Sequence, residues 1–171
     1  MKLIYQGNLY ESTFSQATED KILATIKAAP RFKQSRENKI YRVGGIVRDK
    51  LLGVESKDVD YVVTNVAFDA LKKALETISD KVISTDVGDD MQVIKAVIDG
   101  SEEPYDFAIP RTEVYGGSGR HSDVTAIGNP ILSVEDDLSR RDLTINSIAY
   151  DIETHQLIDP FGGVNDIHNK I

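Results

Sequence analysis

Apolar residues recur along this chain with two different periods, and the period predicts the type of each element. Over 18–28, Ile22 and Ile26 lie one helical turn apart, and Pro30 ends this predicted helix. Short apolar runs bounded by Gly, Pro or Asp predict strands instead. The same reasoning predicts further helices over 46–52, 68–78, 133–148 and from 164 onward, and strands over 40–43, 58–64, 81–84, 91–98, 105–109, 150–152 and 156–158.

The order of these elements predicts an α+β fold in which helices flank a mixed β-sheet. With 171 residues, 40% of them hydrophobic, the chain can form one domain, or one domain with a short appendage. The stretches 1–17 and 111–130 lack a clear period, so we expect irregular structure there. We divide the chain into an N-terminal extension with one helix, residues 1–32, and a main domain, residues 33–171.

Charge and composition narrow the possible functions. The net charge is −8, and an acidic surface repels nucleic acid unless basic residues cluster, so tight autonomous RNA binding is not expected. A nucleotide held through a metal ion is compatible with this charge. The absence of cysteine excludes disulfides and thiolate chemistry. No membrane-length apolar run or signal-peptide core occurs, which favours a cytoplasmic protein without a membrane partner.

Two carboxylates two residues apart form the most informative pattern. Asp58 and Asp60 fall at the start of an apolar strand, where alternate residues point to the same face. Like charges held together on a largely buried strand need a compensating cation, and a divalent metal is the simplest one. The alternative is a solvated surface pair, the ordinary interpretation of pairs such as Glu135 and Asp137.

A pair of glycines precedes these acids. Gly44 and Gly45 separate a predicted strand from a predicted helix, and Arg48 lies in the first turn of that helix. Glycines let a phosphate approach the backbone, and Arg48 offers a charged fork, so the segment predicts an anion site. The alternative is an ordinary tight turn. The segment matches neither a dinucleotide fingerprint nor a Walker loop.

Further polar residues extend both predictions. Asp106 lies between apolar residues in another predicted strand, and three convergent carboxylates suit a two-metal mechanism. Its alternative is a solvent-facing position on an edge strand. Arginines followed by an acid and an amide could contact phosphates and sugar hydroxyls, although a salt-bridged helix surface is the commoner use. These residues are Arg140, Arg141, Asp142 and Asn146.

Together these segments resemble the catalytic head of the class II tRNA nucleotidyltransferases (CCA-adding enzymes) and of the related bacterial poly(A) polymerases. The resemblance covers roughly residues 38–171. It implies the polymerase β-like nucleotidyltransferase head fold. The matching segments, in the order in which the family has them, are 41–49, 57–60, 105–115, 137–146 and 157–163, with Asp166 after them.

The resemblance also implies an activity, namely template-independent transfer of NMP from ATP or CTP to an RNA 3′ hydroxyl, in particular that of a tRNA. Asp58, Asp60 and Asp106 would be the catalytic residues and would bind two Mg²⁺ ions, which Mn²⁺ could replace. Residues 111–128 would lie near the site. The nucleotide-binding residues would be Gly44, Gly45, Arg48, Asp49, Arg111, Arg140, Arg141, Asp142 and Asn146.

The chain departs from the family in what it does not contain. In the family, a helical neck that selects the base follows the head, and a body and tail hold the tRNA; none of these is recognisable in residues 1–171. The chain could be a head from a longer protein, a minimal enzyme, or a subunit whose partner chain supplies neck and body. Two other functions stay open: a regulatory module that binds NTP–Mg²⁺, and transfer to a hydroxyl of a protein or small molecule.

Overall fold

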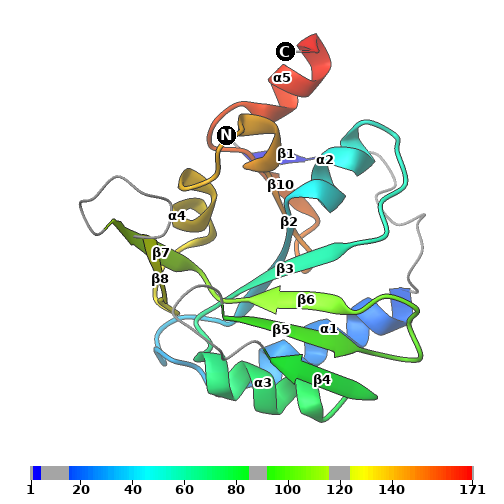
Figure 1. The fold of residues 1–171 in the computed structure, drawn as a ribbon, viewed down its shortest axis with the longest axis vertical. Coiled ribbons are helices and arrows are strands. Elements are labelled where there is room, and N and C mark those ends of the chain that lie inside the picture. The colour runs from blue at the N-terminus through cyan, green and yellow to red at the C-terminus, as the bar shows by residue number, and fades with distance from the viewer. Residues whose placement is uncertain (1, 5–15, 85–91, 116–123, 171) are drawn as a thin grey trace.

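An eight-stranded mixed sheet forms the centre of the molecule in the computed structural model, which describes residues 2–4, 16–84, 92–115 and 124–170 (Figure 1). The strand order is β1-β10-β9-β2-β3-β6-β5-β4, and β3 pairs with β6 in parallel while the other neighbours are antiparallel. The predicted α+β class with a mixed sheet is thereby confirmed. The strands are β1 (Lys2–Ile4), β2 (Lys39–Val43), β3 (Val59–Thr64), β4 (Lys81–Ser84), β5 (Val93–Val97), β6 (Tyr105–Ala108), β9 (Ala149–Asp151) and β10 (Gln156–Ile158).

Alternation along the strands gives the sheet two different faces. On β3, Tyr61 and Val63 join the larger apolar cluster, whereas Asp60 and Val62 point to the opposite face. The larger cluster includes side chains from α1, α2, α3 and α5, and the smaller one is covered by α4. The helices are α1 (Gln16–Ala28), α2 (Gly45–Leu51), α3 (Phe68–Glu76), α4 (Val134–Ser139) and α5 (Gly163–Asn169). In the described part of the chain, no helix combines the length and the apolar character needed to cross a bilayer.

Helix α1 is attached to the sheet by a buried ion pair as well as by apolar contacts. Glu19 accepts hydrogen bonds from Arg42 Nε at 2.7 Å, from Arg42 Nη2 at 2.5 Å and from the Tyr61 hydroxyl at 3.0 Å. The Arg42 guanidinium also lies over the Tyr150 ring, 5.6 Å from its centroid. Ile22 of α1 is fully buried in the larger cluster. Helix α1 therefore shares its core with the rest of the sheet, although the boundary at residue 32 stays a prediction.

The predicted helices over 18–28, 46–52 and 68–78, and the hairpin of β9 and β10, are confirmed within one or two residues at each end. The predicted strand over 91–98 is found as β5, although residue 91 itself lies outside the described residues. Most element types were therefore readable from local periodicity.

Three expectations about local structure were wrong. Residues 2–4 are not irregular, because β1 pairs with β10 at the sheet edge. Nor is 111–130 irregular throughout: β7 (Arg111–Tyr115) and β8 (Val124–Gly128) form a separate two-stranded sheet. The helix predicted over 133–148 ends at Ser139 and is followed by a short 3₁₀ helix, η2 (Thr144–Asn146).

Tertiary contacts explain why that helix does not continue. Leu143 is extended, with φ −126° and ψ 137°, so the chain changes direction before η2. Helix α5 then packs directly on η2, because a Cβ at Gly163 would come within 2.2 Å of the Thr144 carbonyl oxygen. The Asp159 carboxylate accepts hydrogen bonds from the backbone N–H groups of Gly163 and Val164 and so fixes the start of α5. Local propensity is overridden here by close packing.

Candidate functional site

The turn between β2 and α2 requires glycine at its first position. Gly44 has φ 72° and ψ −137°, a conformation that side chains rarely adopt. A Cβ at this position would also lie 3.1 Å from Arg141 Nη1 and 3.7 Å from Asp60 Oδ2. The missing side chain therefore brings the backbone next to both an arginine and a carboxylate.

Arg48 in α2 has its guanidinium oriented by two partners. Its Nε donates to Asp49 Oδ1 at 2.8 Å, and its Nη1 donates to Asn146 Oδ1 of η2 at 2.8 Å. The backbone N–H groups of Val47 and Arg48 both donate to the Gly44 carbonyl oxygen. An anion at this turn would therefore meet the edge of the oriented Arg48 guanidinium. The N–H groups of Val47 and Arg48 would not bind it, because both already donate to Gly44.

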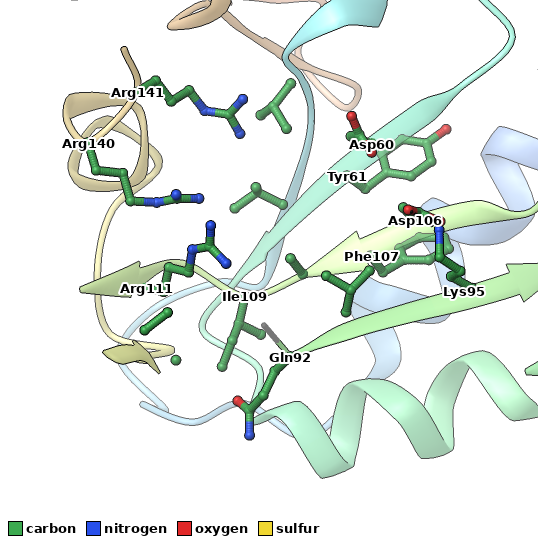
Figure 2. Close-up of a pocket in the computed structure, with 16 residues that line it drawn as sticks. Asp60, Tyr61, Gln92, Lys95, Asp106, Phe107, Ile109, Arg111, Arg140 and Arg141 are labelled. Carbon is green, nitrogen blue, oxygen red and sulfur yellow. Dashed lines mark hydrogen bonds and ion pairs between the residues drawn. The ribbon is translucent and has the colours of Figure 1, made fainter. Parts of the chain in front are cut away.

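Two of the three predicted acids lie side by side on the sheet. Asp60 on β3 is the register partner of Asp106 on β6, and Asp106 is the register partner of Lys95 on β5. Register partners point to the same face, so all three side chains project from the face opposite the larger core cluster. Figure 2 shows the three together at one end of the pocket.

Their charges are only partly compensated. Lys95 Nζ lies 2.6 Å from Asp106 Oδ2, whereas Asp106 Oδ1 is buried and has no hydrogen-bond partner within the described ranges. The pKa of Asp60 is raised above its usual range, first because the surrounding protein desolvates its charged form, even though the residue is partly open to solvent, and then because Asp106 and, more weakly, Asp58 repel it. The nearby Arg141 offsets part of this rise. An orphaned carboxylate oxygen beside a carboxylate of raised pKa fits a cation.

Asp58 is not brought into the same position. It precedes β3, is exposed and lines neither of the two cavities described below, although its charge is felt at Asp60. Within the described ranges, no three acidic or histidine side chains come together closely enough to form a metal site by themselves. The assignment of Asp58, Asp60 and Asp106 as ligands stays a prediction.

Three arginines face the acids from the other side. The buried Asp137 of α4 accepts a hydrogen bond from Arg140 Nε at 2.9 Å and forms an ion pair of 3.5 Å with Arg141 Nη2. Arg140 Nη1 also reaches Glu113 of β7 at 3.3 Å. Arg111 lies at the start of β7, and burial followed by the charge of Arg140 lowers its pKa. The arginines that follow α4, and Arg111 at the start of β7, thus hold positive charge over the sheet.

The arrangement leaves hydrogen-bond donors unused. The Nε atoms of Arg111 and Arg141 are buried and have no hydrogen-bond partner in the part of the chain that the structure describes. Buried donors without partners are costly, and an anion could satisfy them. The guanidinium groups of Arg111 and Arg141 are among those drawn around the pocket in Figure 2.

Two adjoining cavities connect these groups. One of about 400 Å³ has Asp60, Lys95 and Asp106 on one side and Arg111, Arg140 and Arg141 on the other, and apolar residues such as Val62 and Ala108 also line it. The second, of about 470 Å³, shares Asp60 and the three arginines with the first. Its full lining is Gly44, Gly45, Arg48, Asp60, Arg111, Arg140, Arg141, Asp142 and Asn146. The structure therefore gathers all the predicted site residues except Asp58 around two cavities, with Asp49 beside Arg48.

The sequence did not point to three polar residues of this site. Lys95 on β5 faces the acids, Asp137 orients the arginines, and Glu113 contacts Arg140. A signal for Lys95 existed, since it is a cation between the buried Ile94 and Ala96 and must face the other side of the sheet. Arg120 and His121, expected near the site, lie outside the described residues.

Acids in one row of a mixed sheet, facing arginines across a cavity, are the arrangement of a nucleotidyltransferase head domain. The chain belongs to the family of the poly A polymerase head domain, whose family model matches residues 40–171. The predicted resemblance is thereby confirmed.

Individual relatives carry related names. The Multifunctional CCA protein of Xylella fastidiosa (strain 9a5c) is 41% identical over 133 residues, which are 78% of this chain and 29% of the relative. The Bacillus stearothermophilus CCA-adding enzyme in complex with CTP is similar with a TM-score of 0.60 and 31% identity, over 89% of this chain and 31% of that one. The Thermotoga maritima CCA-adding enzyme complexed with tRNA-CCA is similar with a TM-score of 0.64 and 25% identity, over 98% of this chain and 34% of that one. The chain thus spans about a third of the length of these relatives.

Proposed function

We propose that this chain carries the transfer site of a template-independent nucleotidyltransferase, which moves NMP from ATP or CTP to an RNA 3′ hydroxyl, tRNA in particular. The single observation that carries the proposal is the cavity in which Asp60 and Asp106 face Arg111, Arg140 and Arg141. The acids at one end of the cavity would hold the metal ions of a metal-bound triphosphate, and the arginines at the other end would bind its phosphates. Relatives whose names include CTP and tRNA support the substrate classes.

The arginines would bind the phosphates and the charge that develops on the departing pyrophosphate. The Nε atoms of Arg111 and Arg141 supply donors that have no partner among the described residues, and a triphosphate would satisfy them. Asp137 fixes Arg140 and Arg141 before the nucleotide arrives, so little reorganisation is required at the moment of transfer.

Residues of the second cavity would hold the nucleotide's sugar. Asp142 and Asn146 line this cavity and offer oxygen acceptors and an amide donor for ribose hydroxyls. Asn146 is fixed in turn by its hydrogen bond from Arg48. Gly44 keeps the wall next to Arg141 free of a side chain, which leaves room for the phosphates.

Asp60 and Asp106, together with Asp58, would hold divalent cations, for which we propose two Mg²⁺ ions, replaceable by Mn²⁺. Bound there, the cations would polarise the reacting phosphate and make the acceptor hydroxyl more acidic. Asp106 Oδ1, which has no hydrogen-bond partner among the described residues, would accept the proton of that hydroxyl. The division of the chain at residue 32, and a separate chain that supplies neck and body, belong to this proposal as well.

The test combines nucleotide binding with incorporation. The 171-residue chain is incubated with Mg²⁺, labelled ATP or CTP and a tRNA that lacks its 3′-terminal CCA, and label in RNA is measured alongside NTP binding. Asp60→Asn should abolish incorporation, whereas Asp99→Asn, at an exposed carboxylate paired with Lys21, should not. Incorporation that survives in Asp60→Asn, or no NTP binding by the unmodified chain, would contradict the proposal.

One observation favours a second function, a module that binds NTP–Mg²⁺ without transfer. Asp58 lies outside both cavities and Asp106 is paired with Lys95, so Asp60 alone of the three predicted ligands lines the cavity without an ion pair to a described residue. NTP binding with no label in RNA would favour this module. Label that instead appears on a protein or small-molecule hydroxyl would show transfer to another acceptor.

A further inference from the structure

Lys95 is the one cation within ion-pair distance of the paired acids in the described part of the chain. Its Nζ lies 2.6 Å from Asp106 Oδ2, and its charge also reaches Asp60, whose pKa it tends to lower. The side chain is 43% exposed and lines the cavity with its partner (Figure 2). Lys95 therefore stands inside the candidate site and is not a remote surface residue.

Stability alone does not account for this position. A half-exposed ion pair adds little to folding because solvent screens it. The Lys21–Asp99 pair has nearly the same geometry, at 2.7 Å with side chains 42% and 44% exposed, but it lies away from both cavities. What distinguishes Lys95 is a second carboxylate close by, that of Asp60, which is the register partner of Asp106 on the neighbouring strand.

The ammonium compensates only one of the oxygens available to it. Lys95 contacts Oδ2 of Asp106, while Oδ1 of the same carboxylate is buried and has no partner among the residues that the structure describes. Asp60 has a raised pKa. Counted by themselves, the two carboxylates and the ammonium carry one net negative charge, which attracts a divalent cation, although Arg141 across the cavity offsets part of it at Asp60. A cation that used both Asp106 and Asp60 would approach the ammonium closely and be repelled by it.

We propose that Lys95 is a resident counter-ion that holds Asp106 in the metal-free protein and must be displaced when a divalent cation binds. This inference rests on the proposed function, because it assumes that the cation binds at Asp60 and Asp106. Lys95 is then a positioning residue that keeps the acids together without metal and lowers the affinity for a bare cation. A cation that arrives with a triphosphate brings negative charge that offsets this repulsion.

The test measures Mn²⁺ binding directly, through the electron paramagnetic resonance signal of free Mn²⁺, with no nucleotide present. Lys95→Met keeps the aliphatic stem and removes the charge. The Mn²⁺ dissociation constant of this variant should therefore be about tenfold lower than that of the unmodified chain, which is a gain of about 1.4 kcal/mol in binding free energy. Lys95→Arg should stay close to the unmodified chain. Lys21→Met, the matched control, should also leave the constant unchanged, because it removes the same charge from a similar ion pair.

The outcomes separate the inference from the function on which it rests. Equal or weaker Mn²⁺ binding by Lys95→Met, with its circular dichroism unchanged, overturns the role of Lys95 and leaves the proposed function standing. Tight Mn²⁺ binding that survives Asp60→Asn in the Lys95→Met background places the cation elsewhere and overturns both. Tighter binding by Lys95→Met without RNA transfer supports the counter-ion and contradicts only the transfer activity.

Discussion

Replacing Glu19 by alanine tests whether α1 is an integral part of the sheet that carries the site. Glu19 is buried, and its carboxylate accepts two hydrogen bonds from Arg42 and one from the Tyr61 hydroxyl. Arg42 lies on β2, two residues before Gly44, and Tyr61 follows Asp60 on β3. The change therefore acts on the two strands that position the cavity, from the opposite face of the sheet.

The expected loss is large because both charges are buried. The Arg42 side chain is 6% exposed and that of Glu19 is 4% exposed. Removing one partner of a buried ion pair leaves the other charge without its compensation in a low-dielectric interior, which costs about 3–5 kcal/mol. Replacing both by apolar residues, as in Glu19→Met with Arg42→Met, should recover most of that loss, since no buried charge then remains.

The assay is urea unfolding followed by circular dichroism, with a linear extrapolation of the free energy of unfolding. Glu37→Ala serves as the control, because Glu37 is an exposed carboxylate paired with Lys27, and its loss should hardly move the midpoint. A loss below about 1 kcal/mol in Glu19→Ala would refute the reasoning, since a buried pair would then have behaved as a surface pair. A separate early transition for α1 would instead favour an extension that unfolds by itself.

Two further changes probe the site itself. Because the pKa of Asp60 is raised in the folded state, its charged form costs stability above that pKa, and Asp60→Asn should raise the metal-free unfolding midpoint at pH 7. The gain should disappear as the pH falls below the ordinary value of 3.8, and a gain that is constant with pH would contradict this cause. Gly44→Ala should cost about 1–3 kcal/mol through its backbone and weaken NTP binding by displacing Arg141, which is measured by NTP titration. Gly53→Ala, with the same φ of 72° but open space around it, should lose stability alone, and equal losses of NTP binding in both would argue against the contact with Arg141.

Local patterns predicted the parts of the fold that depend on local forces. The strand, glycine turn, helix and strand from β2 to β3 follow directly from apolar runs and Gly44, and so does the placement of Asp60 on one face. The hairpin of β7 and β8 was missed because its strand residues show no sustained alternation, and its pairing is set by register and not by period. The end of α4 was missed because close packing of α5 on η2 determines it.

The candidate site shows the same division. Asp60 and Asp106 could be proposed from sequence, but their adjacency depends on the parallel pairing of β3 with β6. Lys95 was missed for a related reason, since its contact with Asp106 arises from the pairing of β5 with β6. Asp137 looked like one acid among several on a helix, and only its burial between two arginines distinguishes it.

Side chains on β6 alternate between the cavity and the core, with Asp106 facing one and Phe107 the other. Deleting a single residue within β6 would exchange these directions, so an aromatic ring would enter the cavity and a carboxylate would enter the core. Insertions in the turn at 99–104 would leave the ladder of β3 and β6 unchanged. The face of the sheet that carries Asp60 and Asp106 therefore tolerates changes in the length of this turn, but no insertion or deletion within the strand.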